Sequence, residues 1–392
     1  MLKTKKILFY SHDTFGLGHI RRTQKIANSV ARNDRSILIA CASPKASSFA
    51  SQSGIEYLNL PGFTKQISGE YSHRSLNIPI DQFVNLRSSL LLSSVRSFNP
   101  DLVIIDKEPL GVKKELLPSL EYLRQHSKNT RIICGFRDIL DEKEAVADEW
   151  SRRGTAEALE RYFDHILIYG KKSIFDFASE YELSPALSQK LEYTGYIAPD
   201  MSSHFGEFHF KFKNSNPVVT FTLGGGGDGW EFLETFIELL EKGLHRKGPP
   251  YNVFILTGPF AKPELIRKVR EMGQSADDIQ ALDFTPDAAS AFLQSQMIVS
   301  MGGYNTVIEL CAMNKFPLIL PRTVPRKEQI IRAEHFKQSG FCDYLSPEKV
   351  KAEILGKKIA EHLAKAASLK VPEFNTEGLQ VIQNLFDQWL KK

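Results

Sequence analysis

The run Thr222-Leu-Gly-Gly-Gly-Gly-Asp-Gly229 decides the fold of this chain. It follows the apolar, β-branched segment Pro217–Thr222 and precedes a helix-patterned segment from Trp230 to Leu244. A strand that passes through clustered glycines into a helix is typical of a phosphate site. Glycine lets backbone N–H groups converge on an anion, and the helix N-terminus adds about half a positive charge. Similar turns lie at Phe15–His19 and Ser300–Thr306. Three such turns indicate a nucleotide-linked ligand.

Strand-like and helix-like runs alternate along the chain, which predicts an α/β fold with parallel, doubly wound sheets. We expect an N-terminal domain at 1–198, a linker at 199–215 and a second domain at 216–370. An amphipathic helix within 371–392 can cap either domain. The expected strands are Lys6–His12, Ser36–Ala42, Glu56–Leu60, Leu102–Asp106, Arg131–Phe136, His165–Tyr169, Val218–Leu223, Val253–Thr257, Ile279–Phe284, Met297–Met301 and Phe316–Leu320.

Composition excludes several classes of protein. The chain has 392 residues, 42% hydrophobic residues and a formal net charge of +4, which argues against bulk nucleic-acid binding. It has no apolar run of membrane-spanning length, and its N-terminal apolar run is too short for a signal peptide, so we expect a cytoplasmic protein. Neither the histidines nor the cysteines have metal-ligand spacing, and no cofactor is expected. The cysteines are expected to be reduced core residues: Cys41, Cys134, Cys311 and Cys342.

The polar stretch Pro61–Pro79 interrupts the strand-and-helix pattern and is expected to be a loop. It carries Tyr71, His73 and Arg74, which suit a polar substrate. A solvated insertion explains the stretch equally well.

The first glycine run matches a dinucleotide fingerprint by spacing alone, through Gly224, Gly226 and Gly229. That fingerprint also needs an acidic residue after the next strand, and the segment Ile255–Pro259 has none. The N-terminal turn has Arg21 where a third glycine is required. Neither turn ends in the lysine and hydroxyl residue of a P-loop. Dinucleotide enzymes and nucleoside triphosphatases are therefore disfavoured.

The second glycine turn is more specific, because it combines a phosphate site with a carboxylate. Gly302 and Gly303 are expected to place backbone N–H groups at a helix N-terminus. Glu309 lies about two helical turns further on and can accept hydrogen bonds from a ribose, although an exposed helix charge is the plainer explanation. The next strand is followed by Arg322 and Gln329, a cation and a donor–acceptor amide at the same expected sheet edge.

These motifs resemble MurG-type glycosyltransferases with the GT-B fold, in which two Rossmann-like domains flank an interdomain cleft. The matching segments are TLGGGGDG, SMGGYNTVIEL, LPR…EQIIRAEHF and, near the N-terminus, FGLGHIRRT. The resemblance departs from the family at the single Gly-Leu-Gly of the N-terminal loop and at Arg332, where the family has asparagine. It implies that a nucleotide-diphosphate sugar is bound by Gly224, Gly225, Gly226, Gly227, Gly302, Gly303, Glu309 and Gln329. We expect the same donor site to include Gly16, Gly18, Phe284, Asn305, Thr306 and Arg322.

The general base is the least determined residue. His19 begins a helix, where the dipole favours the neutral imidazole, and it can deprotonate a hydroxyl or bind the donor phosphate. Asp13 and Asp106 each follow a strand and compete for the role, with Glu108 as a weaker rival.

The residues and the resemblance together predict an inverting transfer to a hydroxyl acceptor, and the resemblance implies a UDP-linked donor. No D-x-D motif is present to hold a metal, so the glycine turns and an arginine would stabilise the leaving diphosphate. A hydrolase or epimerase of the same fold, or a nucleotide-sugar sensor, remains an alternative. The acceptor is open, and Lys3, Lys5, Lys6, Arg21 and Arg22 leave peripheral membrane contact open as well.

Overall fold

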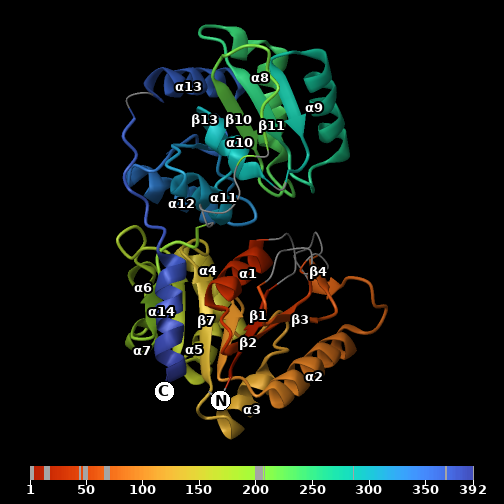
Figure 1. Ribbon diagram of the computed structural model, residues 1–392, viewed down its shortest axis with the longest axis vertical. Coiled ribbons are helices and arrows are strands. Elements are labelled where there is room, and N and C mark those ends of the chain that lie inside the picture. The colour runs from red at the N-terminus through yellow and green to blue at the C-terminus, as the bar shows by residue number, and fades with distance from the viewer. Residues whose placement is uncertain are drawn as a thin grey trace. The chain divides into compact units, whose positions relative to one another are not determined.

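The computed structural model of the protein describes residues 4–12, 18–43, 46, 52–65, 71–198, 206, 208–285, 287–366 and 369–391. The chain forms two compact units (Figure 1). Unit 1 comprises Met1–Ile197 and Thr376–Lys392, and unit 2 comprises Ala198–Asn375.

Unit 1 is built on a sheet of seven described strands, all paired in parallel. In spatial order these are β3 (Ile55–Asn59), β2 (Arg35–Cys41), β1 (Lys5–Tyr10), β6 (Leu102–Asp106), β7 (Arg131–Arg137), β8 (His165–Tyr169) and β9 (Leu191–Tyr193). The helices are α1 (Gly18–Val30), α2 (Ile80–Phe98), α3 (Leu117–His126), α4 (Lys143–Arg153), α5 (Thr155–Tyr162), α6 (Phe177–Glu180), α7 (Pro185–Ser188) and α14 (Gly378–Lys391). The central strands are apolar and buried along their length, as is typical of a parallel sheet covered by helices.

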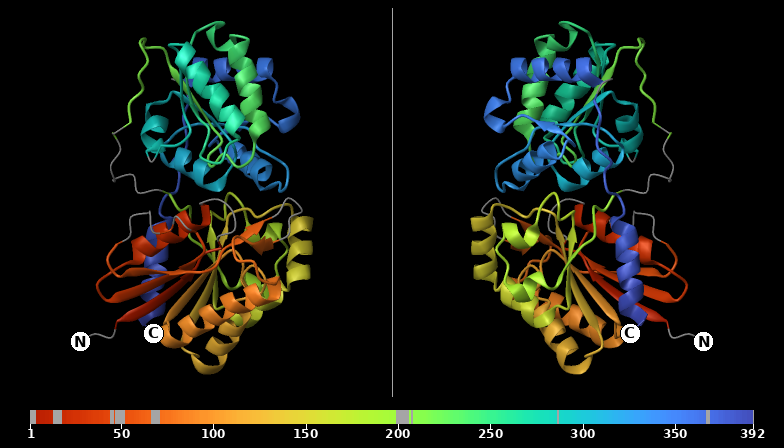
Figure 2. Two further views of the ribbon diagram at one scale, coloured as in Figure 1. Left: turned by 90° about the vertical axis from the view of Figure 1, so that its right-hand side faces the viewer. Right: turned by 90° about the vertical axis from the view of Figure 1, so that its left-hand side faces the viewer.

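The last helix, α14, lies beside α1 in unit 1 (Figures 1 and 2). Its Phe386 contacts Phe9 of β1 with ring centroids 6.4 Å apart, and Trp389 stacks on His165. Burial of each such aromatic ring is worth roughly 1.5–3 kcal/mol. The sequence left open which domain this helix covers, and these contacts assign it to unit 1.

The polar stretch Pro61–Pro79 is not a plain loop, because it contains the antiparallel hairpin β4 (Phe63–Lys65) and β5 (Tyr71–His73). A buried ion pair between Arg87 and Glu115 anchors it, since Arg87 also donates to the carbonyl oxygen of Pro61. Arg74 donates to the carbonyl oxygen of Ala42 and therefore has a structural contact.

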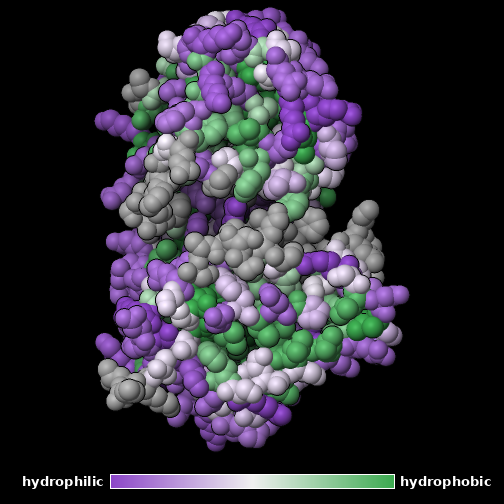
Figure 3. Space-filling view, turned by 45° about the vertical axis from the view of Figure 1, so that its right-hand side comes forward, coloured by the Kyte–Doolittle hydropathy of each residue, from purple (hydrophilic) through white to green (hydrophobic). Residues whose placement is uncertain are grey.

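Apolar side chains are exposed where α2 begins. Leu76, Ile80 and Leu86 keep 41%, 38% and 39% of their surface. Figure 3 shows hydrophobic residues gathered on one face of unit 1. No helix in the described part of the chain has both the length and the apolar character needed to cross a membrane.

Unit 2 repeats the architecture with a six-stranded sheet, also paired in parallel. Its spatial order is β12 (Ile279–Leu282), β11 (Asn252–Leu256), β10 (Val218–Thr222), β13 (Met297–Ser300), β14 (Leu318–Ile319) and β15 (Asp343–Tyr344). The helices are α8 (Trp230–Glu241), α9 (Pro263–Ser275), α10 (Ala288–Gln294), α11 (Tyr304–Ala312), α12 (Glu328–Gln338) and α13 (Ala352–Lys365), with short 3₁₀ turns at Leu244–Arg246 and Pro347–Lys349.

Alternate residues of each strand in unit 2 pack on opposite faces of the sheet. Val219 and Phe221 of β10 face the core under α8, α9 and α13, whereas Val218 faces the core under α10 and α11. Three phenylalanines of the expected linker, Phe208, Phe210 and Phe212, pack on this second core. Residues 208–212 are therefore part of unit 2 and not a free linker.

Candidate functional site

The first two glycine turns of unit 2 begin side by side. Strands β10 and β13 are parallel neighbours, and Thr222 at the end of β10 pairs in register with Ser300 at the end of β13. The strand order reverses at this pair, because β11 and β12 lie on one side and β14 and β15 on the other. Ligands of open α/β sheets bind at the carboxyl ends of the strands where the order reverses. The glycine turns therefore occupy the expected ligand site of this unit.

The two turns touch each other, and the contact requires glycine. Gly224 has a φ of 70°, and a Cβ there would lie 3.2 Å from Oγ1 of Thr306 in α11. Gly229 has a φ of 74°, and its Cβ would strike Sδ of Met301 at 2.2 Å. Both positions also need the left-handed backbone that glycine adopts without strain.

A third glycine turn, after β11, was missed by the sequence reasoning. Gly258 has a φ of 87°, and a Cβ there would lie 2.5 Å from the carbonyl oxygen of Gly224. Gly226 is held in the same way, with the carbonyl oxygen of Thr257 2.4 Å from its would-be Cβ. The N–H of Phe260 donates to the carbonyl oxygen of Gly225 at 3.1 Å. The signal was present in Thr257-Gly258-Pro259, a glycine turn directly after a buried strand.

At two glycines of the site, neither a close contact nor a positive φ requires glycine. Gly225 has only a ring atom of Phe260, 3.9 Å away, near its would-be Cβ, and Gly303 has nothing within 4 Å. Neither has a positive φ. Gly225 is exposed, and Gly303 and Gly227 are half-buried. A Cβ at Gly303 would therefore meet no described atom within 4 Å, and a Cβ at Gly225 would make only an ordinary contact with Phe260.

Helix α11 carries the expected polar residues of the second turn. Gly303 is its N-cap, so Tyr304, Asn305 and Thr306 form its first turn. Thr306 and Glu309 are three residues apart and share one face of the helix. Because Thr306 contacts the first glycine turn, Glu309 lies on the same side as that turn, and it is half-buried.

Helix α12 holds Gly302 through two side chains. The Oε1 atom of Gln329 accepts the N–H of Gly302 at 3.0 Å and the N–H of Arg322 at 3.3 Å. Nη1 of Arg332 donates to the carbonyl oxygen of Gly302 at 2.9 Å. The expectation that the N–H of Gly302 points at an anion is therefore wrong, because Gln329 already accepts it. The Nε2 atom of Gln329 has no hydrogen-bond partner among the described residues.

Arg322 links the first glycine turn to α12. Its Nε lies 2.5 Å from Oδ2 of Asp228, and its Nη2 lies 2.9 Å from Oε1 of the buried Glu328. The guanidinium thus reaches the expected site but is paired with two carboxylates. Phe284, the other expected donor residue, follows β12 and keeps 51% of its surface exposed, as Phe260 after β11 keeps 43%.

Unit 1 reverses its strand order between β1 and β6, and polar side chains gather at the carboxyl ends of these strands. His19 lies in the first turn of α1, which begins at Gly18, and its Nδ1 is 2.5 Å from Oδ2 of Asp106 at the end of β6. Nη2 of Arg22, one turn further along α1, lies 2.6 Å from Oδ1 of the same carboxylate. The sequence proposed His19 and Asp106 as rivals, and the structure places them in one cluster with Arg22.

The geometry assigns the proton on His19. A carboxylate only accepts hydrogen bonds, so Nδ1 carries the hydrogen and donates it to Asp106. The Nε2 atom then holds the lone pair, and it has no hydrogen-bond partner among the described residues. The side chain of His19 is 19% exposed. This is the arrangement of a general base oriented by a carboxylate.

Burial and charge separate the pKa values of this pair. Burial lowers the pKa of His19 to about 4, against the raising effect of Asp106, whose charge Arg22 already compensates. Burial opposes ionisation of Asp106, but the nearby Arg22 and the contact with His19 hold the pKa of that carboxyl well below its usual range. Asp106 is therefore a weak base that orients His19, whereas His19 is neutral at pH 7.

The remaining groups at this edge are paired. Glu108 forms ion pairs with Arg153 and Lys107, so its role as a rival base is disfavoured. The ring of the buried His12 lies edge-on to His19, with centroids 5.3 Å apart. Asp13 and Gly16 lie outside the described residues.

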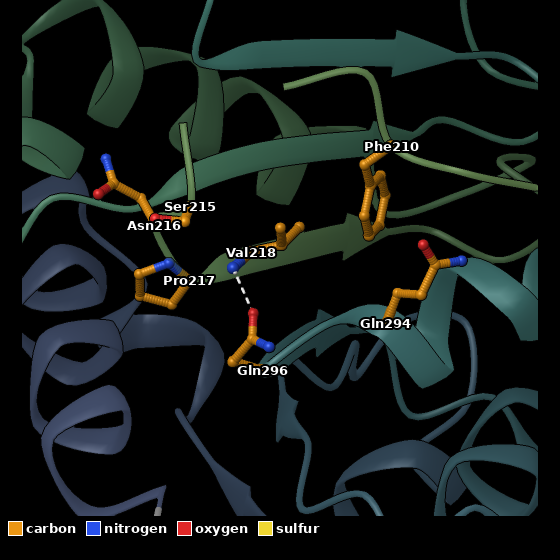
Figure 4. A pocket seen from close by; sticks show the side chains of 7 residues that line it. All are labelled: Phe210, Ser215, Asn216, Pro217, Val218, Gln294 and Gln296. Atoms are coloured by element: carbon orange, nitrogen blue, oxygen red, sulfur yellow. Dashed lines mark hydrogen bonds between the residues drawn. The ribbon is translucent and has the colours of Figure 1, made fainter. Parts of the chain in front are cut away.

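Outside these sites, the described residues form a cavity but no candidate metal site. Among the described residues, no group of three or more His, Cys, Asp or Glu side chains is placed to hold a metal ion. A cavity of about 510 Å³ opens in unit 2, and Figure 4 shows Gln296 on one of its walls, hydrogen-bonded to the N–H of Val218. Its lining begins β10, so it lies at the amino ends of the strands, opposite the glycine turns.

Comparison with known proteins identifies the second half of the chain. Residues 219–384 match the model of the "Glycosyltransferase family 28 C-terminal domain". The UDP-N-acetylglucosamine–N-acetylmuramyl-(pentapeptide) pyrophosphoryl-undecaprenol N-acetylglucosamine transferase of Streptococcus sanguinis (strain SK36) is 25% identical over 210 residues, 52% of this chain and 55% of that protein. The enzyme of the same name from Streptococcus pneumoniae (strain JJA) is 24% identical over 184 residues, 46% of this chain and 48% of that protein. The chain thus spans about half the length of the curated relatives it matches.

Solved structures extend the likeness of fold to the whole chain. MurG of Acinetobacter baumannii superposes with a TM-score of 0.60 at 14% identity, over 98% of this chain and 99% of that one. The S. aureus MnaA–UDP co-structure gives a TM-score of 0.66 at 12% identity, over 99% and 97%. The predicted fold class of two Rossmann-like halves is confirmed. Residues 219–384 thus match the family 28 C-terminal domain, within a fold of two Rossmann-like halves that is similar to the fold of MurG.

Proposed function

We propose that the protein is an inverting, metal-independent glycosyltransferase that moves a sugar from a UDP-sugar to a hydroxyl acceptor. The observation that carries this proposal is the pair of glycines without a structural demand, Gly225 and Gly303, at the switch point of a family 28 domain. A diphosphate can approach the backbone closely where glycines without side chains follow the carboxyl ends of the strands. The UDP link is supported by the donor named in the curated relatives.

The donor diphosphate is proposed to bind between the first turn and the N-terminus of α11. The N–H groups of Gly303, Tyr304 and Asn305 are the first of that helix, and the helix dipole favours an anion there. The unpaired Nε2 of Gln329 adds a donor for phosphate or sugar, as the family resemblance implies. The carboxylate of Glu309 is proposed to accept the ribose hydroxyls.

The proposed base is His19. Its Nε2 would take the proton of the acceptor hydroxyl while that oxygen forms a bond to the anomeric carbon. The bond from that carbon to the phosphate oxygen breaks on the opposite face, so the configuration inverts and the diphosphate leaves with the electron pair. Asp106 would stabilise the imidazolium that forms, and proton transfer of this kind contributes roughly 10²–10⁴-fold to the rate.

The acceptor is proposed to be a hydroxyl of a lipid-linked or saccharide molecule, since the curated relatives are named for a pyrophosphoryl-undecaprenol substrate. The exposed apolar residues at the start of α2 suit contact with a lipid surface. A lipid-linked acceptor would place the reaction at the cytoplasmic face of a membrane. Sugar transfer into the lipid extract of vesicles, and not into free oligosaccharides, would establish the lipid acceptor.

A first experiment tests the donor. Thermal unfolding is measured with UDP, GDP, CDP and TDP and their sugars, and we expect the largest stabilisation with one UDP-sugar. The matched donor is then incubated with candidate acceptors in EDTA, and NMR follows the anomeric configuration of the product. A retained configuration, or loss of activity in EDTA, would contradict the mechanism.

The same experiment separates the alternatives. A UDP-GlcNAc 2-epimerase from Neisseria meningitidis, solved with UDP-GlcNAc bound, has a similar fold, with a TM-score of 0.60 at 12% identity. An epimerised sugar nucleotide or free sugar formed without acceptor would favour an epimerase or a hydrolase. Binding of a nucleotide sugar with no turnover under any condition would favour a sensor.

A further inference from the structure

We propose that Arg332 is a positioning residue that fixes the orientation and the electrostatic potential of the second glycine turn. It would thereby aim the N–H of Gly303 at the diphosphate of the donor. This inference rests on the proposed function of the turn and adds a residue that the family pattern does not supply, because the family has asparagine at this position.

Two side chains of α12 hold the backbone of Gly302. Gln329 and Arg332 lie three residues apart on α12 and so share one face of the helix. Gln329 accepts the N–H of Gly302 at 3.0 Å, and Arg332 donates to its carbonyl oxygen at 2.9 Å. Both backbone hydrogen-bonding groups of Gly302 are therefore held by α12.

The peptide bond between Gly302 and Gly303 is planar, which links the directions of its two polar groups. The carbonyl oxygen of Gly302 and the N–H of Gly303 belong to the same trans peptide, so they point in opposite directions. When Arg332 holds the oxygen toward α12, the N–H of Gly303 points away from α12. A peptide between two glycines can flip more easily than any other, because neither residue has a Cβ. The clamp removes that freedom.

Arg332 also brings a positive charge close to the N-terminus of α11. Arg332 is fully buried, with 0% of its surface exposed, and a guanidinium does not lose its proton in proteins. Its guanidinium carbon lies 5.7 Å from the ring centroid of Tyr304, the first residue of α11. A fixed positive charge under a helix N-terminus acts on an anion through low-dielectric protein and strengthens the dipole there.

The experiment compares ligands that differ only in phosphate. Calorimetry measures the affinity of uridine and of UDP for the wild type, R332M and R332K, with the exposed R267M of α9 as control. We expect R332M to weaken UDP roughly ten- to a hundredfold and uridine less than twofold. Lys keeps the charge but not the planar donor, so R332K should weaken UDP by an intermediate factor.

The outcomes are distinct. Equal losses for uridine and UDP in R332M, or no loss for either ligand, would overturn the positioning role. If R332M does not fold, R332K gives the same comparison, and a UDP affinity equal to that of R267M would refute the proposal. Failure of the wild type to bind any nucleoside diphosphate would instead refute the proposed function and the inference with it.

Discussion

The two units share one topology and use its switch point in opposite ways. In unit 1 the strands β1 and β6 meet where the order reverses, and the ends of the sheet carry His12, Asp106 and, from α1, His19. In unit 2 the strands β10 and β13 meet in the same way, and the ends carry glycine backbone. Among the described residues, unit 1 thus presents titratable side chains beside the start of α1, and unit 2 presents N–H groups and a helix dipole.

Under the proposed function, this difference assigns proton transfer to one unit and donor binding to the other. Proton transfer needs a side chain whose pKa can be adjusted by burial, which the packed cluster of His19, Asp106 and Arg22 provides. Stabilising a leaving diphosphate needs several donors fixed in place, which bare backbone provides without side-chain entropy. Variants that act on one unit should therefore separate chemistry from donor binding.

The largest effect is expected for His19→Ala. We expect kcat to fall roughly 10²–10⁴-fold with little change in donor affinity, because the proposed base is lost and the glycine turns are intact. Steady-state kinetics and calorimetry with the same UDP-sugar measure the two quantities. His126→Ala removes an exposed histidine from α3 and should leave both unchanged. A kcat within tenfold of wild type would remove His19 as the base.

The next effect is expected for Asp106→Asn. The amide no longer holds the hydrogen on Nδ1 of His19, so we expect kcat to fall roughly 10²–10³-fold. Thermal unfolding of the variant is measured alongside the kinetics, because Arg22 loses its buried counter-charge and the fold itself can be weakened. Asp148→Asn, which removes an exposed ion pair of α4, is the control. A normal kcat in a folded variant would show that the carboxylate does not orient the base.

In unit 2, Gly303→Ala and Gly226→Ala should differ in their effect on stability. Gly303 has room for a Cβ, so we expect unchanged thermal stability but a donor KM raised roughly ten- to a hundredfold. Gly226 has a carbonyl oxygen 2.4 Å from its would-be Cβ, so its replacement should lower the unfolding temperature as well. An unchanged donor KM for Gly303→Ala would mean that no ligand approaches this turn.

The sequence predicted most of this contrast, but not the contacts that create it. Glycines 224–227 and 302–303 follow strands whose apolar runs are plain, so their place at the strand ends could be predicted. The pairing of Asp106 with His19 joins residues 87 apart and depends on β6 lying beside β1, which only the strand order decides. The clamp of Arg332 on Gly302 spans 30 residues and depends on the placement of α12.

A smaller effect is expected for Glu309→Gln. Gln keeps one acceptor oxygen but loses the charge, so we expect donor KM to rise roughly three- to tenfold with kcat nearly constant. The rise in donor KM should disappear when the donor carries a deoxyribose, because that sugar lacks the hydroxyl from which Glu309 is proposed to accept a hydrogen bond. Glu231→Gln, at the start of α8, is the control. An equal rise with ribose and deoxyribose donors would refute the ribose contact.

The smallest effect concerns pH and tests unit 1 again. The neutral imidazole is the active form of His19 in the proposed mechanism, and burial lowers its pKa to about 4. The neutral fraction is therefore lost only as the pH falls through about 4, and kcat/KM should fall less than about twofold between pH 7 and pH 5. If His19 had an ordinary histidine pKa, about 6.5, kcat/KM would fall roughly 25-fold over that range.

The free energy of unfolding should also fall as the pH falls. The unfolded chain takes up protons below about pH 6.5, whereas burial lowers the pKa of His19 and of His12 in the folded protein. Activity recovered after return from pH 5 to pH 7.5 separates titration of the base from unfolding. A reversible loss centred near pH 6.5 would mean that burial does not control this base.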